Sequence, residues 1–314
     1  MPTHGIHHIT AIAGNPQSNI DFYVGTLGMR LVKKTVNFDD PHRYHFYYGD
    51  GVGRPGTILT FFAWGDSSAR KGRRGTGQVT TISLSVPETS LEFWKRRLEE
   101  KDVHVDGPFD RFGEEFVRFR DPDGLELELV AASDSRSGWE SESAPPGEAI
   151  RGLHSLSLSV AGEGTERLIT GMLGFRKVAD EGDRCRYEAG EGGPGNMVDV
   201  LRRPGSPAGR MGVGVNHHVA WRITDGETQA ELRGRLLDSG SKVSEVMDRS
   251  YFRSIYFNEP GGVLFEVATD SPGFDIDEDV EHLGSSLKLP ARLEPRREEI
   301  EMVLPPVVIP RTDG

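Results

Sequence analysis

Cysteine and long apolar segments are both nearly missing from this sequence, and each shortage excludes a class of protein. Cys185 is the single cysteine among 314 residues, so no internal disulfide can form, which is typical of proteins in a reducing compartment. No apolar run approaches the roughly 20 residues that a membrane-spanning helix needs, and residues 1–8 show neither the charged leader nor the apolar core of a signal peptide. These shortages predict a cytoplasmic protein that does not cross a membrane.

Positive charge is scarce as well. Lys and Arg number 37 against 49 Asp and Glu, which gives a formal net charge of -12. Because non-specific binding to nucleic acid or to anionic lipid depends on clustered Lys and Arg, we expect neither as a partner. The expected partners are small molecules, with self-association into a homo-oligomer left open. The chain is long enough for two domains of ordinary size.

The most informative feature that is present is an internal repeat. Four segments begin with the alternation of apolar and small or polar residues that is typical of a strand, at 5–12, 78–85, 152–159 and 215–222. Each is followed by a stretch of helical period, at 16–27, 90–100, 163–173 and 228–238, and then by further β-rich stretches. The repeating unit is therefore a strand, a helix and about three antiparallel strands.

Four such units predict the fold class and the domain organisation. We expect an α+β protein of four βαβββ modules paired into two domains of curved antiparallel sheet. The segment 133–150, rich in Ser, Glu, Pro and Gly, is predicted to link modules two and three. The expected divisions are an N-terminal domain at 1–132, a C-terminal domain at 151–274, and a tail at 275–314 that lies as a strap over the body.

Aligning the opening strands locates a candidate site. Modules one and four begin with paired histidines, and the second member of each pair is His8 or His218. Modules two and three carry Thr81 and Ser155 at the same places. A lone histidine on a strand is more often an ordinary polar residue than a ligand. Two pairs at equivalent places in two modules favour ligands instead.

The closing strands add a carboxylate to this site. An ungapped alignment through their turn prolines groups four residues, Glu266, Glu128, Phe61 and Val200. If modules one and four share a cavity, its four positions hold two imidazoles, one carboxylate and the apolar Phe61. The cavity of modules two and three then has no nitrogen ligand, and we expect it to bind no metal.

Two histidines and one carboxylate in one cavity predict a metal site. This set leaves about half of an octahedron open, as in the facial triad of non-haem Fe(II) enzymes that hold substrate and O₂ together. We therefore expect Fe(II), or Mn(II) in second place, and oxygen chemistry. Neighbouring side chains of a strand point to opposite faces, so only one member of each pair, His7–His8 or His217–His218, can face the cavity squarely. The residues alone leave open which member that is.

Several stretches together resemble the vicinal oxygen chelate superfamily, and within it the ring-cleaving dioxygenases that open hydroquinones. The matching stretches are 6–10, 21–23, 28–35, 55–57, 216–220, 248–249, 256–257 and the Leu- and Pro-rich tail. The resemblance implies that the second histidine of each pair binds the metal, so that the ligands are His8, His218 and Glu266. It also implies that four residues surround the open coordination positions and act in catalysis, namely His7, His217, Arg249 and Tyr256.

The length of one hairpin loop decides where Tyr256 lies. A four-residue loop before the closing strand would make Ile255 the cross-strand partner of Glu266, whereas a loop of odd length favours Tyr256. Without a role in catalysis, Tyr256 would be an ordinary core residue and Arg249 a solvated charge on the surface.

The resemblance implies an Fe(II)-dependent dioxygenase that inserts O₂ into the ring of a hydroquinone- or catechol-type aromatic. Two alternatives compete with it. A glyoxalase-like lyase or isomerase usually fills a fourth protein position with Glu or Gln as a base, and the aligned residue here is Phe61. A metal-free small-molecule binding protein is disfavoured because all three ligands are kept in one cavity and lost in the other.

Overall fold

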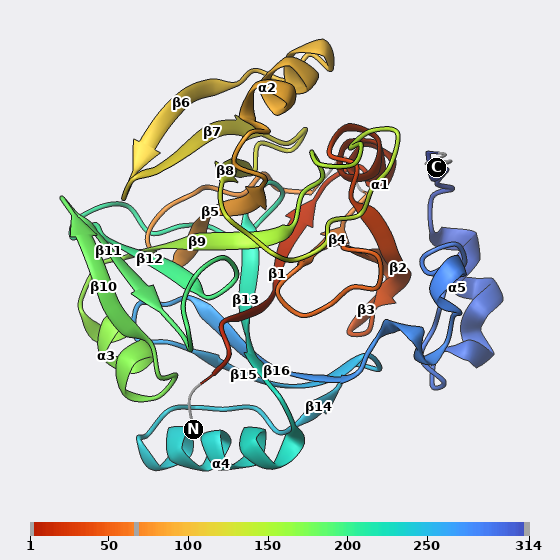
Figure 1. The fold of residues 1–314 in the computed structure, drawn as a ribbon. Coiled ribbons are helices and arrows are strands. Elements are labelled where there is room, and N and C mark those ends of the chain that lie inside the picture. Colours follow the sequence, from red (N-terminus) through yellow and green to blue (C-terminus); the bar gives the residue numbers. More distant parts are fainter. Residues whose placement is uncertain (1–2, 66–68, 311–314) are drawn as a thin grey trace.

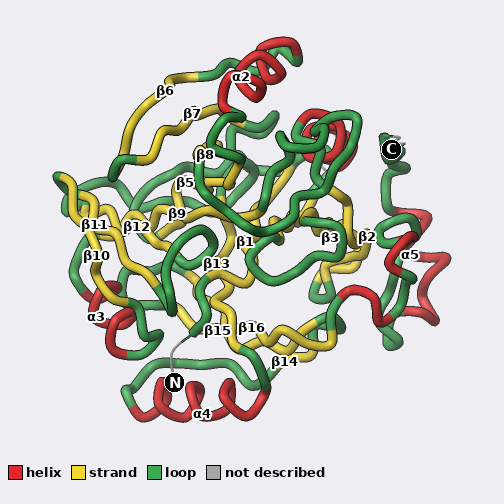
Figure 2. The backbone as a smooth tube through the Cα atoms, in the orientation of Figure 1, coloured by secondary structure: helices red, strands yellow, loops and turns green. Residues whose placement is uncertain are grey.

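Two curved β-sheets make up most of the structure. The computed structural model describes residues 3–65 and 69–310, and in these residues it forms two eight-stranded sheets (Figure 1, Figure 2). The first sheet has the order β14 (Met247–Asp248), β15 (Phe252–Asn258), β16 (Leu264–Pro272), β13 (Asn216–Ile223), β1 (Ile6–Ala13), β4 (Ile58–Ala63), β3 (Asp40–Gly49), β2 (Arg30–Asn37). The second has the order β10 (Arg176–Glu181), β11 (Arg184–Glu188), β12 (Met197–Arg202), β9 (Gly152–Val160), β5 (Gln78–Val86), β8 (Glu126–Ala131), β7 (Glu114–Arg120), β6 (Asp106–Arg111).

One unit recurs four times in these sheets. Each module runs from an opening strand through a helix to three further strands, and its opening strand pairs in parallel with its closing strand, as in β1–β4, β5–β8, β9–β12 and β13–β16. The opening strands of two modules then pair antiparallel, β1 with β13 and β5 with β9. The predicted α+β fold of βαβββ modules is confirmed, and the parallel pairs lie near the centre of each sheet, where two modules join.

Sheet membership does not follow the order of the chain. Modules one and four build the first sheet and modules two and three the second, so each sheet takes strands from both sides of the segment 133–150. The division into 1–132 and 151–274 stays a prediction about domain boundaries and does not describe the sheets. The segment 133–150 is held by Arg136, whose guanidinium donates to the carbonyls of Gly56 (2.8 Å) and Leu153 (2.7 Å).

The helices lie where the sequence predicts them. They are α1 (Pro16–Ile20) with η1 (Asp21–Thr26), α2 (Leu91–Glu100), α3 (Gly164–Gly171) and α4 (Gly226–Asp238). Asn15 caps α1 by accepting a hydrogen bond from the Ser18 amide, because its short side-chain oxygen reaches an amide that lacks a helical partner. Gly174 and Gly240, which follow α3 and α4, have φ values of 79° and 86°. Among the described residues, no helix combines the length and the apolar character needed to cross a membrane.

Helix α4 supports the strand that carries the carboxylate of the candidate site. It packs on β15 and β16 at the lower edge of the molecule in Figure 1, with Leu232 and Leu236 buried. Gln229, also fully buried, donates from Nε2 to the backbone carbonyls of Arg253 and Val267, both at 2.8 Å. These bonds tie α4 to the backbone of β15 and to that of β16 next to Glu266.

The described residues 275–310 lie as a strap against the body of the protein. The strap contains η2 (Phe274–Ile276), η3 (Val280–His282), η4 (Glu294–Arg296) and α5 (Arg297–Val303), and runs along the edge of the first sheet (Figure 1). Lys33 of β2 is fully buried beneath it, with Nζ at 2.6 Å from both Asp277 and Glu278. An ammonium without water needs such partners, so the strap and β2 depend on each other.

Candidate metal centre

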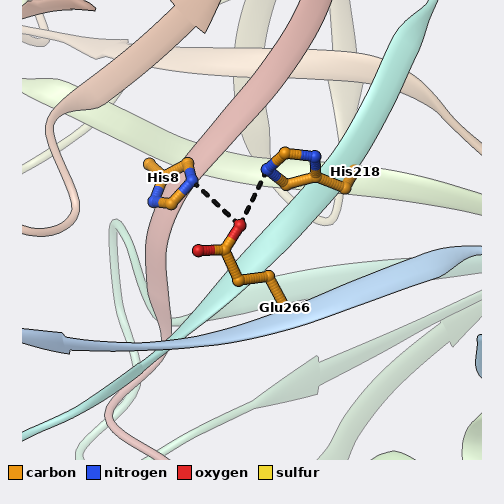
Figure 3. Close-up of side chains that lie close together, drawn as sticks. All are labelled: His8, His218 and Glu266. Carbon is orange, nitrogen blue, oxygen red and sulfur yellow. Dashed lines mark ion pairs between the residues drawn. The ribbon is translucent and has the colours of Figure 1, made fainter. Parts of the chain in front are cut away.

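Three side chains from three strands meet in the cavity of the first sheet. His8 on β1, His218 on β13 and Glu266 on β16 present one ligand atom each, and these atoms all lie within 4.8 Å of one another (Figure 3). Glu266 Oε2 is 2.8 Å from His218 Nε2 and 3.4 Å from His8 Nε2. All three residues are buried. The structure thus brings together the predicted triad, with the second histidine of each pair facing inward.

Strand register explains this convergence. In the antiparallel pair β1–β13, Thr10 lies opposite His218 and His8 opposite Ala220. In the parallel pair β13–β16, Ala220 is level with Glu266. Because alternate residues of a strand share a face, His8 and Thr10 face the same side, as do His218 and Ala220. Ladders between the two ends of the chain therefore place all three triad residues on one face of the sheet.

Two buried polar atoms of the triad lack hydrogen-bond partners. Among the described residues, neither His218 Nε2 nor Glu266 Oε2 forms a hydrogen bond, although the two atoms oppose each other at 2.8 Å. An unpaired buried polar group costs about 1–3 kcal/mol, so the arrangement is unfavourable as it stands. Two imidazole nitrogens and a carboxylate oxygen are ligands that suit a divalent transition metal, and the triad fits such an ion.

The protonation states of the triad suit metal binding. Burial alone would raise the pKa of Glu266, but the adjacent His8 and His218 hold that pKa well below its usual range. Burial lowers the pKa of His218, which leaves its imidazole neutral at neutral pH. A metal ligand must present a lone pair and not a proton, and these shifts supply that state.

The first histidine of each pair contacts the second. His7 Nδ1 lies 2.9 Å from His8 Nδ1, and His217 Nδ1 lies 2.7 Å from His218 Nδ1. His7 and His217 are the extra residues of two β-bulges, because the β1–β13 ladder passes over each of them. The bulges let neighbouring imidazoles meet where a regular strand would point them apart.

The environments of His7 and His217 differ. His7 Nε2 is 3.2 Å from the Thr269 carbonyl, so this nitrogen carries the proton and His7 Nδ1 accepts from His8 Nδ1. His8 Nε2 is then left with its lone pair toward Glu266. His7 lies outside the cavity wall, whereas His217 lines it beside Phe62. Burial lowers the pKa of His217 to about 3, so its imidazole is neutral.

Tyr256 and Arg249 line the cavity that contains the triad. The loop between β15 and β16 spans the five residues 259–263, and this odd length makes Tyr256 the cross-strand partner of Glu266. Arg249 Nε donates to the Tyr256 hydroxyl oxygen at 3.0 Å, and Arg249 Nη1 is 3.2 Å from the Asp39 carboxylate. Burial raises the pKa of Tyr256, which keeps its hydroxyl protonated. Of the four predicted helper residues, all but His7 line the cavity.

The register corrects the fourth position of this site. In the pair β13–β16, Glu266 is level with Ala220, which stands two residues after His218. The equivalent residue two after His8 is Thr10, and in the pair β1–β4 Thr10 is level with Thr60, not Phe61. The ungapped alignment was wrong by one residue, and a slip of one residue moves a side chain to the other face of a sheet. Phe61 is fully buried on that other face, 4.5 Å from the Tyr23 ring. The fourth position is therefore a neutral hydroxyl.

The same correction applies to the second sheet. Asp199, not Val200, is level with Ser157 and so occupies the position that corresponds to Glu266. Asp199 is fully buried and accepts from Arg184 and Arg186 at 2.9 and 2.8 Å. The second sheet therefore holds two carboxylates at these positions, Glu128 and Asp199, and surrounds them with guanidinium groups.

Neither of the two cavity residues of β3 was named from the sequence. His45 and Tyr47 of β3 line the wall opposite Tyr256, with Tyr47 Oη at 3.0 Å from His45 Nδ1. Tyr47 pairs with Thr60 as Tyr256 pairs with Glu266, so the two tyrosines hold equivalent positions in modules one and four. Extending the module alignment to the third strand of each unit would have found Tyr47.

Comparisons with known proteins agree with this geometry. A family model described as "Glyoxalase/Bleomycin resistance protein/Dioxygenase superfamily" matches residues 5–129. The chain is 45% identical to "Putative ring-cleaving dioxygenase MhqO" of Bacillus subtilis, over 99% of each chain. It is 35% identical to the "Chlorohydroquinone/hydroquinone 1,2-dioxygenase" of Sphingobium indicum, over 97% of each chain.

Solved structures give the same result for the fold. A crystal structure of a dioxygenase of Bacillus subtilis, named there as putative, superposes with a TM-score of 0.94 at 44% identity and covers 99% of each chain. Glyoxalase I from Zea mays shares the fold at a TM-score of 0.64 and 16% identity, covering 85% of this chain and 92% of its own. The chain therefore belongs to the glyoxalase, bleomycin resistance protein and dioxygenase superfamily, the vicinal oxygen chelate proteins, and its full-length relatives in that superfamily are named as ring-cleaving dioxygenases.

Proposed function

We propose that this protein is a non-haem Fe(II)-dependent dioxygenase that cleaves the ring of a hydroquinone- or catechol-type aromatic, with Mn(II) as the second choice of metal. The observation that carries the proposal is the buried triad of His8, His218 and Glu266 with its unpaired His218 Nε2 and Glu266 Oε2. One full-length relative named as a ring-cleaving dioxygenase and another named as a hydroquinone 1,2-dioxygenase support the same reaction. A reducing cytoplasm is the proposed location, because it keeps iron in the Fe(II) state.

The cavity suits a single aromatic ring. Its volume is about 530 Å³, within the range of small-molecule sites, and it reaches from the triad to the surface. Apolar side chains form much of its wall, and they are Phe38, Phe62, Met247, Phe252 and Leu264. Burying a ring against such a wall stabilises binding through the hydrophobic effect, while the polar groups near the triad orient it.

The bound metal would supply a Lewis acid that lowers the pKa of a substrate hydroxyl and open positions at which substrate and O₂ can meet. The protein would supply hydrogen-bond donors around those positions. Tyr256 accepts from Arg249 Nε, so its own proton is directed to the cavity. His217 accepts from His218 at Nδ1 and, being neutral, carries its proton on Nε2. These donors would stabilise negative charge that develops on oxygen, and the guanidinium of Arg249 strengthens the effect.

The two alternatives fit less well. A glyoxalase-like reaction calls for a carboxylate or amide at the fourth protein position, and Thr60 there offers a hydroxyl already hydrogen-bonded to Thr10 and His45. A metal-free binding protein would leave His218 Nε2 and Glu266 Oε2 buried and unpaired. The first alternative therefore lacks its base, and the second leaves two buried polar atoms without partners.

Metal analysis followed by oxygen uptake tests the proposal. Protein prepared without oxygen and loaded with Fe(II) is expected to hold one metal ion per chain and to consume one O₂ per hydroquinone or catechol molecule, with loss of the aromatic absorbance. Glu266→Gln serves as the control that keeps the cavity but removes a ligand. An Fe(II)-loaded protein that leaves every diol intact, while isomerising a glutathione hemithioacetal, would replace this function with the glyoxalase-like one.

A further inference from the structure

We propose that Tyr47 accepts a hydrogen bond from the substrate hydroxyl that keeps its proton, and so makes the site selective for aromatic diols over monophenols. This rests on the proposed function, and it assigns the two equivalent tyrosines of the cavity opposite hydrogen-bonding roles. Tyr256 donates to the substrate side of the cavity, and Tyr47 accepts from it.

The two tyrosines occupy equivalent strands on opposite arms of the first sheet. β3 and β15 are each the third strand of their module, and the strands β4, β1, β13 and β16 separate them. Tyr47 and Tyr256 both line the cavity, and the triad lies on the strands between them. After burial, the nearby Tyr256 hydroxyl and the Glu266 carboxylate are the main groups that raise the pKa of Tyr47. An aromatic ring placed over the triad would therefore have one tyrosine on either side.

A chain of hydrogen bonds fixes the polarity of Tyr47. Thr60 donates its hydroxyl proton to Thr10 Oγ1 at 2.9 Å, so Thr60 Oγ1 can only accept in its other hydrogen bond. The partner in that hydrogen bond is His45 Nε2, at 2.8 Å, and this nitrogen must therefore carry the imidazole proton. Burial lowers the pKa of His45 well below its usual range, which keeps the ring neutral and leaves Nδ1 without a proton. Tyr47 consequently donates its hydroxyl proton to His45 Nδ1 at 3.0 Å.

The consequence is an oxygen with free lone pairs and no free proton. Tyr47 Oη can accept from the cavity but cannot donate to it, whereas Tyr256 has the reverse polarity because its oxygen accepts from Arg249 Nε. Ser244, another hydroxyl of the wall, is already used, since it donates to the Glu245 carbonyl and accepts from the Tyr256 amide. Tyr47 is thus an acceptor of fixed polarity beside the triad.

A diol bound as its monoanion matches this pattern. One oxygen loses its proton to bind at the triad, and the other keeps its proton and can donate it to an acceptor in the cavity wall. A monophenol carries no second proton and leaves Tyr47 Oη unpaired, which costs binding energy. Hydroquinone meets this requirement, because its monoanion retains one hydroxyl proton on the oxygen remote from the triad.

Calorimetric titration of the Fe(II)-loaded protein without oxygen tests the assignment. Hydroquinone and 4-fluorophenol have similar size, but only hydroquinone can donate from its second substituent. The unsubstituted protein is expected to bind hydroquinone about 10-fold more tightly than 4-fluorophenol, the effect of one hydrogen bond to a buried acceptor. In Tyr47→Phe the two affinities should differ by less than about 2-fold, mainly through weaker binding of hydroquinone.

Two further variants make the result specific. Tyr48→Phe removes the same hydroxyl one residue along β3, where Tyr48 donates to Asn19 on the core side, and it should keep the original ratio. His45→Leu removes the acceptor of the Tyr47 proton, so the ratio should fall as in Tyr47→Phe. A ratio that stays unchanged in both Tyr47→Phe and His45→Leu overturns the inference while leaving the dioxygenase proposal intact. Failure of the unsubstituted protein to bind either compound would instead overturn the proposed function and this inference with it.

Discussion

Glu266 on β16 and Glu128 on β8 hold the same position in the two sheets, yet their neighbours differ. Each carboxylate is buried and accepts from a serine, Ser254 in one sheet and Ser83 in the other. Glu266 otherwise faces two imidazoles, with its Oε2 at 3.4 Å from His8 Nε2 and 2.8 Å from His218 Nε2, and burial lowers the pKa of His218. Glu128 faces guanidinium groups, with oxygen–nitrogen distances of 2.7 Å to Arg111 and 3.1 Å to Arg118.

The backbones of the two sheets match even in their irregularities. Thr80 and His154 are unpaired bulge residues of the β5–β9 ladder, just as His7 and His217 are unpaired bulge residues of the β1–β13 ladder. The bulges are therefore a property of the repeated module and not of the metal centre. His154 still contacts its neighbour, with Nδ1 at 3.1 Å from Ser155 Oγ, but its Nε2 lies 3.0 Å from the Glu114 carboxylate.

The difference between the sheets lies in where the compensating positive charge comes from. Arginines of the second sheet neutralise its buried carboxylates within the chain, so that site is complete without a ligand. In the first sheet Glu266 forms an ion pair with no Arg or Lys among the described residues, and its negative charge favours a bound cation. One backbone thus supports either a self-contained ion cluster or a site for a metal, depending on a few side chains.

Removing the carboxylate of the first sheet should have the largest effect. Glu266→Gln is expected to lose the metal and essentially all dioxygenase activity, because an amide is a poor ligand and the negative charge of the triad disappears. Metal content after dialysis and oxygen uptake measure the two losses. Retention of stoichiometric iron in this variant would show that Glu266 is not a ligand.

Removing the hydroxyl that faces the triad should slow the reaction without losing the metal. Tyr256→Phe is expected to keep full iron occupancy and to lower kcat by roughly 10²-fold, because a positioned proton donor contributes about that much. Steady-state kinetics at saturating diol, with metal content measured on the same sample, check this. Turnover close to that of the unsubstituted protein would leave Tyr256 as a packing residue.

The corresponding change in the second sheet should affect stability and not metal binding. Glu128→Gln leaves Arg111 and Arg118 without their shared buried partner, and breaking a buried pair in this way costs about 3 kcal/mol or more. Denaturant unfolding measures the loss, and iron content should stay that of the unsubstituted protein. Loss of metal with unchanged stability would mean that the second sheet, and not the first, holds the ion.

The smallest expected effect concerns the pH dependence of the unfolding free energy of metal-free protein. Groups in the two sheets should lower that free energy over different acid pH ranges. His217 has a folded pKa of about 3 against an ordinary 6.5, so the unfolded chain takes up its proton first and stability falls as pH falls from 6.5 toward 3. Glu114, paired with His154 and Arg186, has its pKa lowered from 4.5 to about 2, and its contribution is lost only between those values.

Two variants separate these ranges. His217→Gln should flatten the dependence of the unfolding free energy on pH between 6.5 and 3, and Glu114→Gln should flatten it between 4.5 and 2. The measurement is denaturant unfolding of metal-free protein at a series of pH values. Identical pH profiles for the two variants would contradict the assignment of separate windows to the two sheets.

The sequence by itself determined the repeated module and its local signals. Period-2 and helical patterns and the Asn15 cap of α1 depend on neighbouring residues, so they can be read along the chain. The repeat also pointed to the histidine pairs 7–8 and 217–218 and to Glu266, because equivalent positions of equivalent modules must meet once the modules pair, and the family resemblance then selected His8 and His218. Whether these residues bind a metal, and what the four helper residues do, stay predictions.

Only the tertiary structure decided which strands pair and in what register. It joined modules one and four across the whole length of the chain, placed Thr60 and not Phe61 at the fourth position, and turned Tyr47 and Tyr256 to face one cavity. Ladder registers between distant strands, and the bulges at His7 and His217, arise from long-range packing that no local pattern records. Since a slip of one residue exchanges the two faces of a strand, the chemistry of the cavity wall depended on that packing.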